Sequence, residues 1–376
     1  MVELKIIHFT TVHPRSDIRI RAKEVATLAR VWPGAVALFV QDGKGDETDA
    51  RDGFVIHDTG APQRGRLRRM TVGAWRMYRA VRRARPGIAH FHDPELLPWA
   101  MLLRLSGIQI IYDVHEDVPA AIQSKTYIGP WLRKPVAALM SVVEAGVARL
   151  AAAVIPATPA IGENFASTKS TLVQNFPLLA ELQVEGSAPD ARAAPHFAYV
   201  GGISRIRSAV EMVQAVAMIK RDDVRLQVAG GFAPSLGAQL EQMPGWQRVV
   251  FHGWADRSKV AKILAACRAG LVLFHPEPNH VRAQPNKMFE YMAAGLPVIA
   301  SDFPLWREIV EGAGCGLLVD PQDPQAIARA MQWVLGHPEE AAAMGRRGRA
   351  AVEDRYNWEA ESKKLVALYR RLLPDT

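Results

Sequence analysis

Residues 282–301 read RAQPNKMFEYMAAGLPVIAS, and this stretch decides the fold of the C-terminal half of the chain. Pro285 suits the first position of a helix, where its missing N–H costs nothing, and Gly295 suits the left-handed residue that ends one. Residues 298–300 then read as a short buried strand. A helix that leads into a buried strand is typical of an α/β domain.

The predicted helix carries apolar and polar side chains on different faces. Its apolar positions recur at i, i+3 and i+4, namely Phe289, Met292 and Ala293, whereas its polar positions are Asn286, Lys287 and Glu290. Free N–H groups and a lysine at a helix start attract phosphate, and a carboxylate one turn later can accept hydrogen bonds from a vicinal diol. The pattern fits a nucleotide diphosphate with its ribose, and equally an ordinary sheet-packing helix with a solvated face.

Length and composition indicate two ordinary globular domains. The chain has 376 residues, of which 49% are hydrophobic and 22% charged, and a single core rarely grows to that length. Cys267 and Cys315 form neither a metal motif nor a disulfide framework, which favours a reducing compartment. Without a signal peptide or a transmembrane run, we expect a cytoplasmic protein, or one bound peripherally to the inner face of the membrane. A net charge of +8 favours an anionic partner.

Hydrophobic periodicity divides the chain into an N-terminal domain at 1–178, a linker at 179–195, a C-terminal domain at 196–357 and a last helix at 358–376. In the N-terminal domain we expect strands at 4–10, 35–40, 54–57, 88–92, 108–112 and 154–159 and helices at 18–31, 96–105 and 132–152. Asp17 lies in the loop after the first strand, where it can cap the following helix or contact a ligand.

Residues 64–85 contain nine arginines and no acidic residue. Apolar positions run through the segment at near-helical spacing, with Trp75 beside them. A basic amphipathic helix of this kind can lie on an anionic membrane surface, or it can cover a sheet and leave its arginines in solvent. Both interpretations stay open at this point.

Two neighbouring strands of the N-terminal domain each end in histidine and acid. His92 and Asp93 follow residues 88–91, and Asp113 and His115 follow residues 108–112. Parallel strands joined by one helix place their carboxyl ends at the same edge of a sheet, so both clusters should meet there. This convergence predicts a functional site at that edge.

The C-terminal domain begins with a similar signal for phosphate. A strand at 197–200 leads into the loop Gly201–Ser208, which contains two glycines and two arginines, and then into a helix at 209–219. Such a loop can hold phosphate through its backbone N–H groups and arginine side chains. Further strands are expected at 226–229, 249–251 and 270–274, with a helix at 259–266.

Taken together, five segments resemble the retaining glycosyltransferases of family 4: residues 13–19, 92–97, 112–117, 199–204 and 286–300. The resemblance implies the GT-B architecture, in which two facing Rossmann-like α/β domains hold a nucleotide sugar in the cleft between them. It also implies that the C-terminal helix returns to the N-terminal domain.

The same resemblance assigns roles to individual residues. Glu290 matches the glutamate that binds the donor ribose, Arg207 matches a basic residue on the diphosphate, and His115 matches the catalytic histidine that reaches the transferred sugar. The remaining donor contacts that we expect are Gly202, Ser204, Trp254, Asn286 and Lys287. Asp17, His92 and Arg282 are candidate contacts of the acceptor or the sugar.

Because the sequence departs from the family pattern at three places, the resemblance does not identify the sugar that is transferred. Arg282 stands where the family has its first glutamate, Gly202 replaces an arginine, and the first loop lacks the usual glycine pair. Arg282 suits an acidic sugar or the leaving phosphate, and a solvent-facing arginine is an equal possibility.

The expected reaction is retaining, metal-independent transfer of a sugar from a nucleotide diphosphate sugar to a glycan or polyprenyl-linked acceptor in polysaccharide biosynthesis. We expect no cofactor, no metal and no nucleic-acid partner. A nucleotide-sugar epimerase or hydrolase and a catalytically silent nucleotide-sugar binding protein are the alternatives on the same fold.

Overall fold

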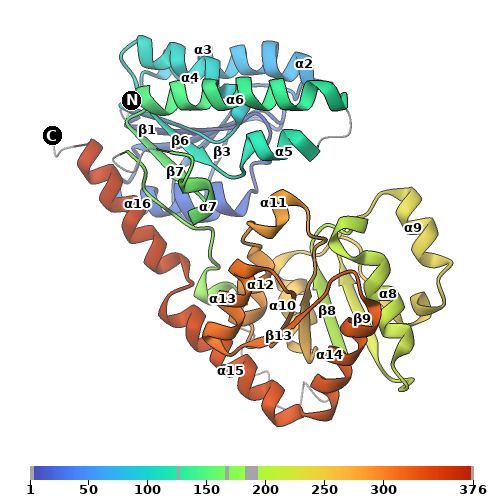
Figure 1. The fold of residues 1–376 in the computed structure, drawn as a ribbon. Helices are drawn as coiled ribbons and strands as arrows, with labels where there is room; N and C mark the ends of the chain where they lie inside the picture. Colours follow the sequence, from blue (N-terminus) through green and yellow to red (C-terminus); the bar gives the residue numbers. More distant parts are fainter. Residues whose placement is uncertain (1–3, 125–127, 166–168, 183–193, 374–376) are drawn as a thin grey trace. The chain divides into compact units, whose positions relative to one another are not determined.

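The computed structural model describes residues 4–124, 128–165, 169–182 and 194–373 (Figure 1). The chain divides into unit 1, residues 1–175 with 360–376, and unit 2, residues 176–359. Most of the predicted linker 179–195 lies outside the described residues, and its first four residues, Leu179–Leu182, form a 3-10 turn. The last helix, α16 (Trp358–Leu372), belongs to unit 1 from Ala360 onward.

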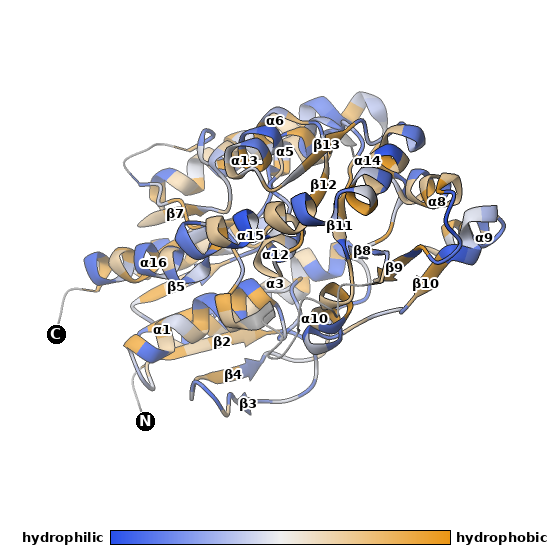
Figure 2. Cartoon of the chain, turned by 90° about the horizontal axis from the view of Figure 1, so that it is seen from below, coloured by the Kyte–Doolittle hydropathy of each residue, from blue (hydrophilic) through white to orange (hydrophobic). Residues whose placement is uncertain are grey.

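Unit 1 is built on a seven-stranded sheet in the order β3-β4-β2-β1-β5-β6-β7. All neighbouring strands are parallel except β3 and β4, which pair antiparallel. The strands are β1 (Ile6–Phe9), β2 (Val36–Val40), β3 (Glu47–Thr48), β4 (Val55–Asp58), β5 (Ile88–Phe91), β6 (Gln109–Val114) and β7 (Ala153–Pro156). β2 is apolar along its whole length and fully buried, as expected of a central parallel strand (Figure 2).

Helices cover both faces of this sheet. They comprise the π-helical segment Ile18–Val25 with α1 (Ala26–Val31), α2 (Arg66–Arg68), the π-helical turn Arg69–Gly73 with α3 (Ala74–Ala84), the 3-10 turn Pro94–Leu96 with α4 (Leu97–Leu105), α5 (Val118–Ser124), α6 (Pro130–Leu150), α7 (Pro159–Gly162) and α16. α3, α4 and α6 lie side by side in one layer (Figure 1).

Unit 2 contains a six-stranded, all-parallel sheet in the order β10-β9-β8-β11-β12-β13. Its strands are β8 (His196–Val200), β9 (Arg225–Ala229), β10 (Val249–Phe251), β11 (Ala269–Val272), β12 (Val298–Ser301) and β13 (Gly316–Val319). The helices are α8 (Ala209–Met218), α9 (Pro234–Glu241), α10 (Arg257–Ala265), α11 (Pro278–Val281), α12 (Asn286–Ala293), α13 (Pro304–Ala313), α14 (Pro324–Gly336) and α15 (Pro338–Asp354), with 3-10 turns at Arg205–Arg207 and Pro244–Arg248.

Each sheet reverses its strand order once, between β1 and β5 in unit 1 and between β8 and β11 in unit 2. In open α/β sheets, ligands bind beyond the carboxyl ends of the strands at this switch point, because the two adjacent loops diverge to opposite faces. Ligand contacts are therefore expected from the residues that follow β1, β5, β8 and β11.

The stretch 282–301 forms the helix and strand that its sequence predicts. α12 ends with Gly295 in the left-handed conformation, at φ 68°, and β12 is buried throughout. The predicted apolar positions are buried, and Met288 and Tyr291 are buried as well, so the inner face is wider than predicted. Pro285 directly precedes the first helical residue instead of occupying it.

Among the described residues, no helix is long and apolar enough to cross a membrane.

Candidate active sites

The loop after β8 depends on two glycines that come very close to each other. A Cβ atom on Gly230 would lie 1.9 Å from the carbonyl oxygen of Gly201, so no other residue fits there. Gly201 itself has a φ of 115°. The hydroxyl of Tyr199 donates to the Gly202 carbonyl at 2.7 Å, and the Ile203 N–H donates to the Gly231 carbonyl at 2.9 Å. This glycine loop is thereby fixed beside the start of α12.

Two cations stand over aromatic rings at this loop. Lys287 Nζ lies 3.8 Å from the ring centroid of Tyr199. The guanidinium of Arg207 lies 5.3 Å from the ring centroid of Phe274 and donates to the Gly202 carbonyl at 2.9 Å. Aromatic faces attract cations through their quadrupole, so they hold both side chains without neutralising them. The predicted pair of basic residues is thus brought to one place.

Lys287 is the most perturbed cation of unit 2. Its ammonium nitrogen is shielded from solvent and has no hydrogen-bond partner among the described residues. Burial, with a smaller contribution from Arg207, lowers the pKa of Lys287 to about 7. An ammonium group in this situation gains strongly from an anionic oxygen, and no side chain caps the first N–H groups of α12 beside it.

Glu290 lies one turn further along α12 and forms an ion pair with Arg257, with Oε1 2.7 Å from the guanidinium. The side chain of Glu290 stays 18% exposed, so its carboxylate is accessible while Arg257 fixes its orientation. Arg257 begins α10, directly after the capping residue Asp256. Sequence reasoning missed Arg257; a basic residue at a helix start near a switch-point strand was the available signal.

The other predicted donor contacts occupy several positions. Asn286 is exposed at the start of α12, and Ser204 directly precedes the 3-10 turn Arg205–Arg207. Trp254 is 82% exposed in the loop after β10. Arg282 is exposed and directly follows α11, four residues before α12 begins.

In unit 1 the two predicted histidine and acid clusters meet. His115 Nε2 lies 2.7 Å from Asp113 Oδ2, and His92 Nδ1 lies 3.0 Å from the same oxygen. Arg19 donates to both carboxylate oxygens of Asp113, at 2.6 and 3.0 Å. Asp113 and His92 are buried, whereas the side chain of His115 remains 20% exposed. His115 is therefore the member of the group that a ligand can reach.

The buried members of this group have shifted pKa values. Burial alone would raise the pKa of Asp113, but Arg19 and His115 hold it well below its usual value. Burial lowers the pKa of His92, which favours the neutral imidazole. A permanently ionised Asp113 consequently orients the His115 ring, in the way that carboxylates orient catalytic histidines elsewhere.

Asp17 caps the helix that follows it and also contacts a histidine. Its Oδ1 accepts from the Ile20 N–H at 3.0 Å, and its Oδ2 lies 3.0 Å from His13 Nδ1. Burial tends to raise the pKa of Asp17, but these hydrogen bonds lower it to about 2. The capping interpretation is confirmed, and the contact with a ligand stays a prediction. His13 in turn packs against His115, with ring centroids 4.8 Å apart.

Asp93 shapes the loop after β1 from the neighbouring strand. Its Oδ2 accepts from the Thr10 hydroxyl at 2.9 Å and from the Thr11 N–H at 2.6 Å. The carboxylate thus holds the loop that carries His13 and Asp17 without requiring the glycine pair that the family pattern has there.

Solved structures similar to the chain share its two-domain architecture. Sucrose-phosphate synthase from Thermosynechococcus elongatus matches with a TM-score of 0.77 and 20% identity, over 98% of this chain and 99% of that one. HepE from Anabaena, solved in complex with UDP-glucose, matches with a TM-score of 0.73 and 15% identity, over 98% and 100% of the two chains. The two parallel-sheet domains are accordingly of the GT-B class.

Family models match both units. Residues 22–170 match the Glycosyl transferase 4-like domain, and residues 194–337 match Glycosyl transferases group 1. The chain belongs to the family 4-type glycosyltransferases.

Curated relatives align over part of the chain. A D-inositol 3-phosphate glycosyltransferase of Corynebacterium urealyticum is 29% identical over 184 residues, which are 46% of this chain and 42% of the relative. Human alpha-1,3/1,6-mannosyltransferase ALG2 is 30% identical over 161 residues, 40% of this chain and 37% of the relative. The chain thus spans less than half the length of the curated relatives it matches.

Because the ammonium group of Lys287 is buried, we expect its replacement to make the folded chain more stable. Lys287→Met should raise the free energy of unfolding by about 1–3 kcal/mol near pH 6, because it replaces an unpartnered polar group with an apolar side chain of similar length. The folded-state pKa lies below that of the unfolded chain, so the penalty is full below pH 7 and fades as pH rises towards the unfolded pKa. Urea unfolding at several pH values measures the difference. The exposed Lys262→Met is the control, and an equal effect of both variants would contradict this assignment.

Proposed function

We propose that the chain transfers a sugar, with retention of configuration, from a nucleotide diphosphate sugar to a glycan or lipid-linked acceptor. The observation that carries the proposal is the buried ammonium of Lys287 beside Arg207 and the glycine loop, which has no hydrogen-bond partner in the part of the chain that the structure describes. Natural proteins seldom retain such a group unless a ligand neutralises it. The negative charge of a bound diphosphate would neutralise the ammonium group of Lys287.

Each part of the unit 2 site fits one part of the donor. Lys287, Arg207 and the uncapped N–H groups of α12 would bind the diphosphate. The carboxylate of Glu290, held by Arg257, would accept hydrogen bonds from the ribose hydroxyls. The complexes of HepE with UDP-glucose and UDP support a nucleotide diphosphate sugar as the class of donor.

The chemical step consists mainly of charge stabilisation. The bond from the anomeric carbon to the diphosphate oxygen breaks, the acceptor oxygen bonds to the same face of that carbon, and its proton passes to the departing phosphate. Lys287 and Arg207 would stabilise the diphosphate as it leaves, which lowers the barrier without a divalent cation. His115, oriented by Asp113, is the residue that we assign to contact the sugar.

The alternatives on the same fold differ in their products. An epimerase or hydrolase consumes the donor without an acceptor, and a binding protein does not consume it at all. Analysis of products with and without acceptor distinguishes the three.

Removing either donor contact should abolish transfer while the fold remains. We expect Glu290→Gln to lower kcat/KM at least 100-fold, because the variant loses the charged acceptor for the ribose hydroxyls. Arg207→Ala should lower kcat/KM by a similar factor, because the leaving diphosphate loses a stabilising positive charge. The measurement is the initial rate of sugar transfer with a panel of nucleotide sugars. Controls are Glu353→Gln and Arg329→Ala, which change exposed ion pairs. Full activity of both site variants would refute the assignment.

The arginine-rich segment supports a second part of the proposal, contact with an anionic membrane. In the layer formed by α3, α4 and α6, the segment 64–85 buries Ala74, Met77 and Val81 against the sheet. Leu67 and Met70, which continue the helical spacing of apolar residues towards the start of the segment, are exposed instead. Large apolar side chains are exposed throughout the layer, at Leu67, Met70, Trp75, Leu105, Trp131, Leu139 and Val142. Exposed apolar groups among arginines are what an anionic bilayer surface binds.

A groove in the same layer adds a candidate site for a lipid phosphate. It is lined by Arg79, Arg82, Arg83 and Arg85 together with residues 106–108 after α4. Four guanidinium groups around one depression favour a phosphate or diphosphate headgroup. The groove lies directly before β5 and β6, at the opposite edge of the sheet from His115, so we infer that it binds a lipid headgroup of the membrane surface and not the reacting part of the acceptor.

Reversing the charge of arginines on α3 should remove membrane binding. The double variant Arg76→Glu/Arg83→Glu should bind vesicles with anionic lipid at least tenfold more weakly than the wild-type chain, because about 1 kcal/mol is lost per basic residue near the surface. Co-flotation with anionic and neutral vesicles measures it. Lys262→Glu/Arg346→Glu makes the same change of charge on exposed positions of unit 2 and should bind normally. Equal, negligible binding of the wild-type chain to both vesicle types would exclude the membrane contact.

A further inference from the structure

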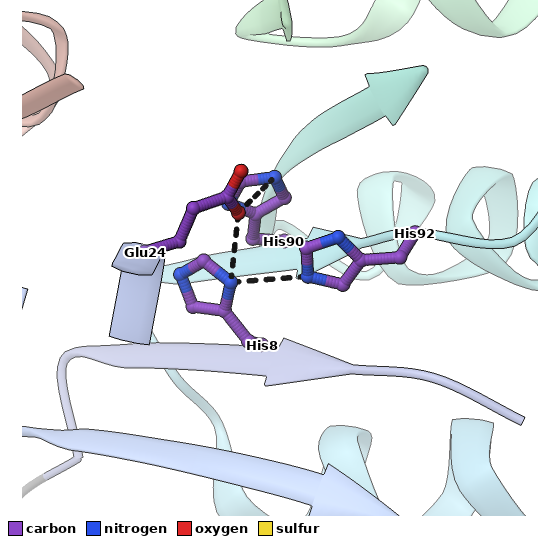
Figure 3. Close-up of side chains that lie close together, drawn as sticks. All are labelled: His8, Glu24, His90 and His92. Atoms are coloured by element: carbon purple, nitrogen blue, oxygen red, sulfur yellow. Dashed lines mark hydrogen bonds and ion pairs between the residues drawn. The ribbon is translucent and has the colours of Figure 1, made fainter. Parts of the chain in front are cut away.

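Unit 1 contains a second group of polar side chains, buried beneath the histidine and acid site. His8 on β1 is in register with His90 on β5, and His92 follows two residues later on the same face of the sheet. Glu24, from the π-helical segment Ile18–Val25, points at these three rings (Figure 3). All four side chains are at most 2% exposed. We refer to His8, Glu24, His90 and His92 as the buried cluster.

The buried cluster contains polar atoms whose hydrogen-bonding capacity is unused among the described residues. Among the described residues, Glu24 Oε2 and His90 Nε2 have no hydrogen-bond partner, although they lie 4.0 Å apart. Buried polar atoms are almost always partnered, and these two face each other in a space that solvent does not reach. A cation bonded to both atoms would satisfy them together.

The distances within the buried cluster fit a tetrahedral metal ion. His8 Nδ1 lies 3.1 Å from His92 Nε2 and 3.7 Å from Glu24 Oε2, and all four ligand atoms lie within 4.8 Å of one another. Metal–ligand bonds of about 2.0–2.1 Å in a tetrahedron separate neighbouring ligand atoms by about 3.3 Å, which lies near the lower end of this range. We propose that the buried cluster binds one zinc ion through three imidazoles and one carboxylate.

The other atoms of the ligands are already held, as they are in known metal centres. His92 Nδ1 lies 3.0 Å from Asp113 Oδ2, His90 Nδ1 lies 2.7 Å from the Tyr369 hydroxyl, and His8 Nε2 lies 3.2 Å from the same hydroxyl. Metal-bound histidines usually donate their second N–H to a carboxylate or another oxygen, and this fixes the tautomer. A tyrosine oxygen has two lone pairs and can accept from both rings.

The charges of the surroundings also favour a cation. In the metal-bound state Glu24 and Asp113 would carry two negative charges, and Arg19 bridges them with one positive charge, with its Nε 3.0 Å from Glu24 Oε1. Neutral imidazoles leave a net charge of about −1 for the group, which attracts a divalent ion. Three nitrogens and one oxygen are a ligand set that zinc accepts, and four protein ligands make it a closed, structural site.

The ion would join parts of unit 1 that are distant in sequence. It would tie β1, β5 and the π-helical segment together, and α16 would be held through Tyr369. His92 connects the ion to Asp113, which orients His115. The buried cluster is thus a positioning element for His115, not part of the transfer chemistry, and the inference does not depend on the proposed function.

Metal analysis of the full-length, tag-free chain tests the proposal. Protein expressed with added zinc should contain about one zinc per chain by mass spectrometry, because a closed four-ligand site binds one ion tightly. X-ray absorption at the zinc edge should show three imidazoles and one oxygen. Removal of zinc by a strong chelator should lower Tm, and zinc should restore it.

Two matched variants identify the site. Glu24→Gln keeps the size of the side chain and should lower zinc content at least tenfold. Glu144→Gln changes another buried glutamate of unit 1, which is bonded to Tyr112 and lies outside the buried cluster, and should keep about one zinc. If Glu24→Gln fails to fold, the wild-type spectrum and chelator shift decide alone. Zinc below a tenth of an equivalent in the wild-type chain, or another ligand set in its spectrum, would overturn the proposal.

Discussion

The site in unit 2 depends on a buried ammonium group that the protein itself does not neutralise. Lys287 stands on the ring of Tyr199 beside Arg207, and its pKa of about 7 expresses the cost of that position. A Cβ atom on Gly201 would lie 3.3 Å from Lys287 Nζ, so the glycine leaves room for the ammonium group. The backbone, the aromatic rings and the cations therefore form a site that suits an anion.

Unit 1 uses the opposite arrangement at the corresponding place in its sheet. There the buried charge is a carboxylate, Asp113 of β6. It is surrounded by Arg19 from the π-helical segment and by the imidazoles that follow β5 and β6. Hydrogen bonds and ion pairs hold Asp113 from several sides, and His115 is the imidazole of this network that keeps an exposed edge. The unit 2 arrangement, and His92 after β5 in unit 1, lie beyond strands that flank a switch point, where the divergence of loops leaves room for ligands.

Local signals in the sequence predicted what depends on neighbouring residues. Gly295 and the spacing of Phe289 and Met292 located α12 and β12 to within a residue, and strand ends brought His92 to His115. Contacts between distant segments carried no such signal. The bond from Arg19 to Asp113 joins residues 94 apart, and that from His90 to Tyr369 joins residues 279 apart. α5, α9 and β3 were missed because they are short and depend on packing.

The central claim, that a nucleotide diphosphate neutralises Lys287, is tested most directly by proton uptake on binding. Isothermal titration calorimetry of nucleoside diphosphates near pH 8, in buffers of different ionisation enthalpy, counts the protons taken up. At that pH most Lys287 ammonium groups have lost their proton, and an adjacent diphosphate should restore it. The account predicts uptake in the wild-type chain and its loss in Lys287→Met. Binding without uptake, or equal uptake in both proteins, would contradict it.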